Sequence, residues 1–298
     1  MLGAAPFVHS AVPGRIRLGG PIFLKTEDPP EQAREHRRLG YSAAYCPAVR
    51  LDDTARVRAT EEAFRREGVV ISEVGAWVNM LDSDAEKRRG NVAYVASRMA
   101  LAEAVGALTC VDIAGSYNPA AWDGPHPKNL SKEFFDATVE NCRRVIDEVK
   151  PKRSKFSVEM MGWAIPDGAD SYLNLIKAVD RPAFGVHVDV CNIINSPARF
   201  YDNAAVIRDV FGKLGRYVVS CHAKDLAWPH EMNVHFVEVV PGRGEIDYRA
   251  YLGELARLPQ QPPLMLEHLK TAEEYEEGKR YILKTGKAAG FAFEEGQA

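Results

Sequence analysis

The sequence predicts an α/β fold, a (β/α)8 TIM barrel that forms a single domain over residues 1–298. Eight apolar, strand-like runs alternate with eight amphipathic, helix-like stretches, and no linker rich in Pro, Gly or Ser interrupts them. Near-continuous apolar runs are typical of parallel strands that helices cover. An open doubly wound sheet usually stops at about five or six strands, so eight βα units favour a closed barrel.

The expected strands cover residues 16–22, 43–46, 69–74, 107–113, 155–160, 184–190, 217–222 and 264–269. The expected helices cover residues 29–39, 54–67, 84–105, 131–149, 171–179, 204–214, 248–258 and 272–289. Capping residues stand at three helix starts: Ser131, Asp247, and Thr271 with Glu274 in a capping-box pattern.

Two long irregular stretches, 115–130 and 227–245, follow the fourth and the seventh strand. Long loops in compact domains are usually functional, so we expect the first of them to be an active-site loop. Within the second, residues 234–240 are a candidate for a short extra strand.

Charge and composition narrow the class of protein. The formal net charge is −3, so the chain lacks the basic excess typical of proteins that bind nucleic acid or anionic membranes. No window reaches the 18 or so apolar residues of a membrane helix, and the first residues do not form a signal-peptide pattern. The five cysteines are widely separated without a C-x-x-C pair, which predicts reduced, mostly buried thiols in a cytoplasmic protein.

Four polar residues interrupt the late apolar runs: Glu159, Asp189, His222 and Glu267. They stand near the ends of the fifth to eighth strands, where barrels carry their catalytic groups. Three carboxylates and one imidazole on one rim would repel each other without a cation, and this oxygen-rich set suits Mn²⁺ or Mg²⁺. The alternative is that each is a solvated or salt-bridged residue at a strand end.

The order Glu, Asp, His, Glu, together with the HAKD and PGRGEIDY segments, resembles the xylose-isomerase-like barrels. That superfamily includes ketose epimerases, hydroxypyruvate isomerases, inosose dehydratases and zinc apurinic-site endonucleases. More narrowly, WDGPHPKNLS, DRPAFGVHVDVCNIINSP and LMLEHL look like the large subunit of bacterial C-glycoside deglycosidases and their 3-keto-glycoside lyase relatives. This narrower resemblance implies a small β-rich second subunit, and we also expect an oligomer.

The resemblance implies one divalent metal, with Mn²⁺ favoured and Mg²⁺, Co²⁺ or Zn²⁺ as alternatives. It also implies proton abstraction next to the carbonyl of a keto-sugar, with Glu159 and Glu267 as acid and base and with Asp189 and His222 as ligands only. A β-eliminating lyase needs one more acid or base, and His126, in the loop after the fourth strand, is the candidate. Its alternative is a solvated loop histidine.

Three further residues are candidates for substrate binding: Arg243, Trp163 and Lys224. Each has an alternative role, as a solvated loop residue, a packing aromatic and a salt-bridge partner, respectively. By strand parity His187 shares the face of Asp189 and is interpreted as a core histidine, whereas His268 is expected to face the helices.

The sequence departs from its relatives at Asn192, where the ketose epimerases and the endonucleases carry a histidine. The expected early strands end near Pro21, Cys46 and Gly75 and supply no further ligands, so nuclease activity is disfavoured. The leading interpretation is a metal-dependent lyase of 3-keto-glycosides. The alternatives are a ketose isomerase or epimerase and, third, a non-catalytic scaffold subunit.

Overall fold

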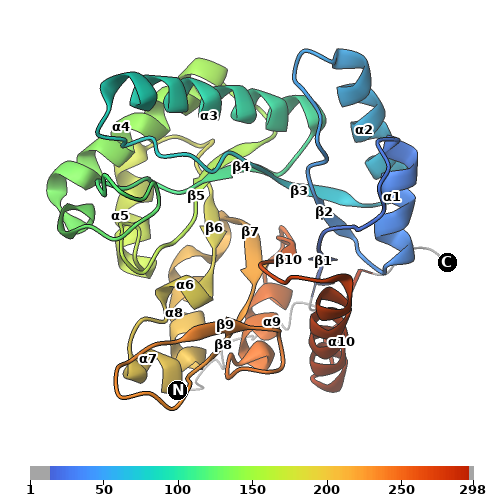
Figure 1. Cartoon of the computed structure of the whole chain (residues 1–298). Helices are drawn as coiled ribbons and strands as arrows, with labels where there is room; N and C mark the ends of the chain where they lie inside the picture. The colour runs from blue at the N-terminus through green and yellow to red at the C-terminus, as the bar shows by residue number, and fades with distance from the viewer. Residues whose placement is uncertain (1–13, 295–298) are drawn as a thin grey trace, which may run out of the picture.

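The computed structural model describes residues 14–294, and within them eight parallel strands form a nearly closed barrel (Figure 1). The predicted domain limits, residues 1 and 298, and the segment assessed for a signal peptide lie outside this range. The barrel strands are β1 (Leu18–Gly19), β2 (Ala43–Tyr45), β3 (Val70–Gly75), β4 (Thr109–Asp112), β5 (Lys155–Val158), β6 (Val186–Val188), β7 (Val218–Ala223) and β10 (Leu264–Leu266).

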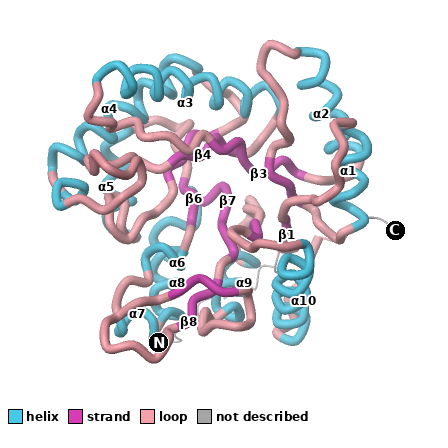
Figure 2. Tube along the Cα trace, in the orientation of Figure 1, coloured by secondary structure: helices cyan, strands magenta, loops and turns pink. Residues whose placement is uncertain are grey.

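Helices surround these strands, as Figure 2 shows. The larger helices are α1 (Pro29–Arg38), α2 (Thr54–Arg66), α3 (Ala85–Val105), α4 (Lys132–Val149), α5 (Ala169–Val179), α8 (Asn203–Leu214), α9 (Tyr248–Ala256) and α10 (Ala272–Ala288). Short helices complete the set: η1 (Pro127–Leu130), α6 (Val190–Ile193), α7 (Pro197–Tyr201) and η2 (Gly215–Tyr217). The predicted (β/α)8 TIM barrel is therefore confirmed.

The hydrogen-bonded order of the strands is β5-β4-β3-β2-β1-β10-β7-β6, and every neighbouring pair is parallel. The ends of this order, β5 and β6, meet through two isolated parallel bridges, Phe156 with Phe184 and Glu159 with His187. The barrel thus closes at a seam with few ladder contacts.

The strands are shorter than the apolar runs that predicted them. The run 16–22 contributes only Leu18–Gly19 to the sheet, and the last strand ends at Leu266 rather than at residue 269. The run 184–190 ends early because the Asp189 side chain accepts a hydrogen bond from the backbone of Asn192 and starts α6. Burial at the mouth of a barrel extends past the last ladder bond, so hydropathy overestimates strand length.

A small hairpin leaves the barrel after β7. It pairs β8 (Asp225–Ala227) with β9 (Val237–Val239) in antiparallel fashion, and it lies on the same side of the molecule as α7 (Figure 1). The extra strand expected within 234–240 is therefore present, and its partner was not predicted. The carboxylate of Asp225 accepts backbone hydrogen bonds from Leu226, Gly242 and Ile246, which ties the loop after the hairpin to its base.

The three predicted helix caps form. Ser131, Asp247 and Thr271 accept hydrogen bonds from the third residue of the helix that each precedes. The capping box differs in one detail, since Glu274 accepts from the backbone of Lys270 rather than from that of Thr271.

Four of the five cysteines are buried, Cys46 is partly buried, and all five are free thiols, as predicted. Within residues 14–294, no helix combines the length and the hydropathy that crossing a membrane would require.

Tyr172 on α5 reinforces the β5–β6 seam from a fully buried position. Its hydroxyl donates to the carbonyl oxygen of Val158 at 2.7 Å, and that carbonyl belongs to the last residue of β5. The same hydroxyl lies 3.1 Å from the carbonyl oxygen of Gly185, just before β6. A side chain therefore joins two strands that share few ladder bonds.

We predict that Tyr172→Phe lowers the free energy of unfolding by about 1–3 kcal/mol, because it leaves buried carbonyl groups without a donor. The measurement is equilibrium denaturation in urea. Tyr94→Phe is the matched control, because Tyr94 is exposed and its change is expected to stay within about 0.5 kcal/mol. Equal effects of the two substitutions would contradict the role assigned to Tyr172 in joining β5 and β6.

Candidate metal centre

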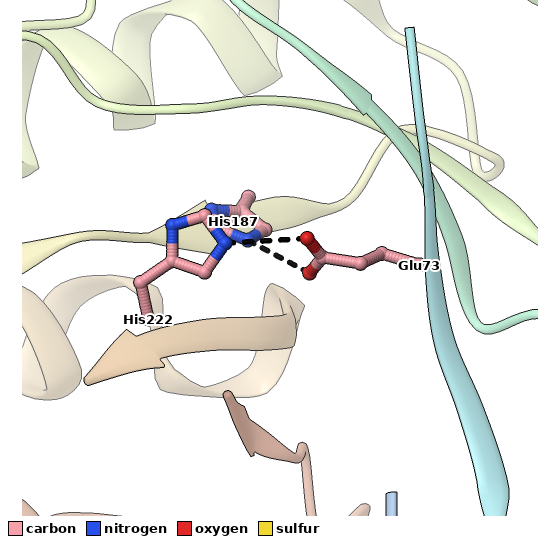
Figure 3. Close-up of side chains that lie close together, drawn as sticks. All are labelled: Glu73, His187 and His222. Carbon is pink, nitrogen blue, oxygen red and sulfur yellow. Dashed lines mark hydrogen bonds and ion pairs between the residues drawn. The ribbon is translucent and has the colours of Figure 1, made fainter. Parts of the chain in front are cut away.

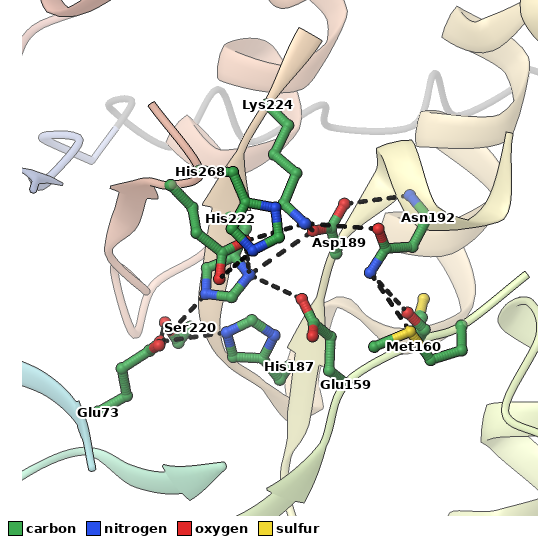
Figure 4. A network of polar contacts seen from close by, with 12 residues as sticks. Glu73, Glu159, Met160, His187, Asp189, Asn192, Ser220, His222, Lys224 and His268 are labelled. Atoms are coloured by element: carbon green, nitrogen blue, oxygen red, sulfur yellow. Dashed lines mark hydrogen bonds and ion pairs between the residues drawn. The ribbon is translucent and has the colours of Figure 1, made fainter. Parts of the chain in front are cut away.

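Four side chains from successive barrel strands converge at the carboxyl ends of those strands. Glu159 directly follows β5, Asp189 directly follows β6, His222 lies within β7 and Glu267 directly follows β10. Each offers one ligand atom, and these four atoms all lie within 4.8 Å of one another. Figure 4 shows three of them, Glu159, Asp189 and His222, pointing toward one another from separate strands.

The imidazole of His222 lies at the centre of this group. Its Nδ1 is 2.7 Å from Oε1 of Glu159, 3.0 Å from Oε2 of Glu267 and 3.6 Å from Oδ2 of Asp189. The Asp189 side chain is held in place by a hydrogen bond, since its Oδ1 accepts from the backbone amide of Asn192. The three carboxylates therefore converge on one nitrogen.

Lys224 supplies a second positive charge from the end of β7. Its Nζ lies 2.9 Å from Oδ2 of Asp189 and 2.9 Å from Oε2 of Glu267, and 3.5 Å from Oε1 of Glu238 on β9. The ammonium group is buried, so these carboxylates take the place of water around it. Lys224 thus forms salt bridges, which the sequence analysis gave as the alternative to substrate binding.

The charges in this group shift one another's pKa values in different directions. Burial raises the pKa of Glu159 despite the attraction of His222. At Glu267 burial opposes ionisation, but His222 and Lys224 outweigh it and lower the pKa to about 2. Burial opposes charge on His222 as well, yet Glu267, Glu159 and Glu73 raise its pKa well above the ordinary value. Asp189, Glu267 and the two bases therefore hold one another ionised, whereas burial favours the protonated form of Glu159.

The donor set fits a divalent cation. Oδ2 of Asp189 and Oε2 of Glu267 are buried and accept no well-aligned hydrogen bond, although Lys224 lies close to both. Buried carboxylate oxygens normally have aligned donors, so these two retain lone pairs for another electrophile. Three carboxylates and one imidazole form a set that Mn²⁺ and Mg²⁺ accept.

A second polar group lies on the interior side of His222. Glu73, from β3, places Oε1 3.2 Å from Nε2 of His222 and Oε2 3.1 Å from Nε2 of His187 (Figure 3). Ser220 donates to Oε2 of Glu73 at 2.7 Å. Burial opposes ionisation of Glu73, but His187 and His222 outweigh it and lower the pKa well below the usual range. The predicted core histidine is therefore part of a polar cluster.

A cavity of about 460 Å³ opens beside the four ligand residues. Glu159 and Glu267 line it, whereas Asp189 and His222 are not among the lining residues. Three tryptophans contribute to its wall: Trp77, Trp122 and Trp163. The cavity therefore combines two carboxylates with aromatic surfaces, as expected for a small polar ligand that carries an apolar face.

Of the predicted substrate-binding residues, Trp163 and Lys224 line this cavity. Arg243 does not line this cavity. It forms a two-pronged ion pair with Glu277 on α10 and borders a larger cavity of about 660 Å³ beside α7. It also lines a smaller cavity of about 200 Å³ together with Lys224 and Glu267. His126 begins η1, where its Nδ1 accepts from the backbone of Lys128, and it is not among the residues that line the 460 Å³ cavity.

The sequence analysis was wrong about the direction of His268. It lines the cavity, and its Nδ1 lies 2.8 Å from Oε2 of Glu238. The parity argument fails because the backbone of His268 has φ of 59°, in the left-handed region, so the strand alternation does not extend to it.

Sequence reasoning also missed Glu73 and Glu238. Glu73 interrupts the buried run 70–75 in the way that Glu159 interrupts its own strand, so the same signal was present in an early strand. Glu238 gave no such signal, because the β8–β9 hairpin that brings it to the cavity was not predicted.

Comparison with known proteins places this geometry in a family context. A family model described as the xylose isomerase-like TIM barrel matches residues 32–285. A 3-keto-D-glucoside 4-epimerase from E. coli has a similar structure, with a TM-score of 0.65 and 12% identity, over 91% of this chain and 100% of that chain. A xylose isomerase-like barrel protein from Mycobacterium smegmatis, in complex with magnesium, is also similar. Its TM-score is 0.61 and its identity 19%, over 87% of this chain and 88% of that chain.

An endonuclease IV from Thermus thermophilus is similar as well, with a TM-score of 0.67 and 16% identity, over 91% of this chain and 99% of that chain. No match was found among curated proteins. At these identities the structures establish the fold alone, and the choice of substrate depends on the side chains.

We predict that Mn²⁺ raises the melting temperature of the wild-type protein and that a chelator reverses the rise. A ligand that binds only the folded state at about 100 times its Kd adds about 2.7 kcal/mol of stability. Glu267→Gln is expected to abolish most of the rise. Glu238→Gln, in the same cavity but outside the four-residue set, is the control and is expected to retain it, as differential scanning fluorimetry can show. A rise that survives Glu267→Gln would place the cation elsewhere.

Proposed function

The chain belongs to the xylose isomerase-like TIM barrel family, and from this premise we propose that it is a divalent-metal-dependent enzyme that moves a proton next to the carbonyl of a keto-sugar. The proton returns to the same carbon from the opposite face, or to the neighbouring carbon, so the reaction is an epimerisation or an isomerisation. The observation that carries the proposal is the convergence of Glu159, Asp189, His222 and Glu267 beside a cavity of sugar size.

The metal would be held by Glu159, Asp189, His222 and Glu267. We propose Mn²⁺, with Mg²⁺, Co²⁺ and Zn²⁺ as alternatives that the same ligand set accepts. When bound, a divalent ion polarises the carbonyl and offsets the negative charge that develops on its oxygen. The magnesium complex of the structurally similar M. smegmatis protein supports a divalent ion in this fold.

Glu159 and Glu267 are the residues for proton transfer, because they line the cavity while the other two candidate ligands lie deeper. In the barrel order, β6 and β7 separate the strands that carry them. Two carboxylates on separate strands can approach a bound sugar from different sides. One removes the proton from carbon and the other delivers it, which is the arrangement that an epimerisation requires.

The cavity walls favour a sugar as the reactant. Trp77, Trp122 and Trp163 offer flat apolar surfaces, against which the C–H face of a sugar ring can pack. Asn192, in place of the histidine of the relatives, donates to the carbonyl of Met160 at 3.1 Å and lies 3.5 Å from Lys224 through its side-chain oxygen. The position therefore still presents a polar group to the cavity, with an amide in place of a basic imidazole.

The similarity to a 3-keto-D-glucoside 4-epimerase supports a 3-keto-glycoside as the substrate class to test first, followed by free ketoses. The predicted β-eliminating lyase uses the same enolisation and then expels a leaving group. Its extra acid, His126, is not among the residues that line the cavity, although Trp122 and Asp123 of the same loop are. Epimerisation needs no acid or base beyond the two carboxylates that line this cavity, so we place it ahead of elimination.

Nuclease activity, which the sequence disfavours, is a further candidate because the endonuclease IV shares the fold. Within the described residues, the groups that could hold a metal number two, and one of them, Glu73 with His187 and His222, is fully buried. The described residues therefore offer no multi-metal site at the barrel mouth. The net charge of −3 also gives no sign of a basic surface for binding phosphates.

The small β-rich second subunit, self-association and a cytoplasmic location remain predictions. Size-exclusion chromatography with light scattering would test self-association. Co-purification from the native host would test the second subunit.

We predict that the Mn²⁺-loaded protein incorporates deuterium from heavy water next to the carbonyl of a 3-keto-glucoside or a ketose. Glu159→Gln and Glu267→Gln are expected to slow this exchange by about 10²- to 10⁴-fold, the usual contribution of a general acid or base. Mass spectrometry follows the label, and metal analysis in parallel separates loss of metal from loss of the base. Glu140→Gln, at an exposed ion pair on α4, is the control.

The same assay separates the two reactions. An epimerase yields a labelled sugar of inverted configuration, whereas a lyase releases the aglycone and is impaired by His126→Ala in release but not in exchange. If the metal-loaded protein gives neither exchange nor release with both substrate classes, the proposal is wrong.

A further inference from the structure

The polar cluster beneath His222 has no role in the proton transfer proposed above. Its members are Glu73, His187, Ser220 and Ser72, and all of them are buried. They are linked in a row, because Ser72 and Ser220 share a hydrogen bond of 2.8 Å and Ser220 donates to Glu73. Figure 4 shows His222 between Glu73 of this cluster and Glu159 and Asp189 of the candidate metal centre.

Every oxygen of Glu73 faces a donor. Oε1 faces Nε2 of His222, and Oε2 faces both Nε2 of His187 and the hydroxyl of Ser220. An ionised carboxylate only accepts hydrogen bonds, so an imidazole nitrogen beside it must carry the proton. Nδ1 of His222 also faces carboxylates, with Glu159 at 2.7 Å. Where a cation takes the lone pair of Nδ1, the contact of 3.2 Å with Glu73 would keep the remaining proton of the ring on Nε2.

Steric contacts hold the ring in the same orientation. The ring of His187 packs against that of His222, with centroids 4.1 Å apart and planes at 70°. Both rings are buried, so rotation of His222 would have to displace His187 and break the contact with Glu73.

We propose that Glu73 is a positioning residue for metal binding: it holds the proton of His222 on Nε2 and so leaves the lone pair of Nδ1 facing Glu159, Asp189 and Glu267. This inference rests on the metal centre of the proposed function. Metal-binding histidines commonly donate their second N–H to such a partner, and loss of that partner typically costs about 10- to 100-fold in metal affinity. Here the partner comes from β3, on the opposite side of the ring from the ligands.

Glu73, His187 and His222 could themselves be regarded as a second metal site, since their ligand-type atoms lie within 4.8 Å of one another. The hydrogen bonds argue against that reading, because both carboxylate oxygens already face donors. The proposal therefore requires one metal ion per chain. It also requires that the cluster of Glu73, His187 and Ser220 supports His222 through hydrogen bonds and binds no metal itself.

The test is isothermal titration of the metal-free full-length protein with Mn²⁺. Glu73→Met removes the acceptor and keeps an unbranched side chain of similar length, and it is expected to raise the Kd by about 10- to 100-fold. Glu73→Gln, which offers its amide oxygen to His222, is expected to recover part of the affinity. Ser157→Ala removes a buried side-chain hydrogen bond outside this cluster, the one between Ser157 and Thr109, and it is expected to bind Mn²⁺ like the wild type.

Wild-type affinity in Glu73→Met would overturn the proposal, as would an equal loss in Ser157→Ala or a stoichiometry of two ions per chain. Should Glu73→Met fail to fold, long-range proton–nitrogen NMR of the Mg²⁺-loaded wild type decides instead. The expected result is a proton on Nε2 of His222, and a proton on Nδ1 would contradict the assignment. Normal Mn²⁺ binding with no activity would reject the proposed function while leaving this inference in place.

Discussion

The interaction on which the centre depends is the attraction between three converging carboxylates and the positive charges among them. Glu159, Asp189 and Glu267 come from different strands and meet within a few ångströms of His222. Removing charges from water is costly unless opposite charges compensate, so the barrel mouth requires cations at this point. Lys224 and a charged His222 meet the requirement through ion pairs, and a divalent ion bound by the carboxylate oxygens that lack an aligned hydrogen bond would also meet it.

The fold supplies the convergence, and the seam between β5 and β6 that closes the barrel lies at the same place. Glu159 and His187 form one of the two isolated bridges that close the barrel between β5 and β6. The seam therefore carries a candidate ligand on one strand and a member of the buried cluster on the other. A change in how β5 meets β6 would move Glu159 relative to Asp189, so closure of the barrel and geometry of the centre are not independent.

The sequence was sufficient for the fold and for the four candidate ligands, because both follow from the position of polar residues in apolar runs. Glu159, Asp189 and Glu267 mark strand ends that hydropathy makes visible. The sequence was insufficient where the backbone departs from regular strand conformation or pairing. The left-handed conformation of His268 and the β8–β9 hairpin that carries Glu238 depend on tertiary contacts, which strand parity does not describe. Glu73 was visible in principle, but only as an isolated charge far from the others in sequence.

His222 contacts two groups of polar side chains, the candidate metal ligands through Nδ1 and the buried cluster of Glu73 through Nε2. Its Nδ1 faces the three carboxylates of the candidate metal centre, two of which, Glu159 and Glu267, border the cavity. Its Nε2 faces Glu73, which is closed off from solvent and is held by Ser220 and His187. In the proposed reaction Glu73 would not meet substrate, so it would keep the proton of His222 on Nε2 while substrate binds beside Glu159 and Glu267. The barrel achieves this by drawing the support from β3, across the interior, while the ligands come from β5, β6, β7 and β10.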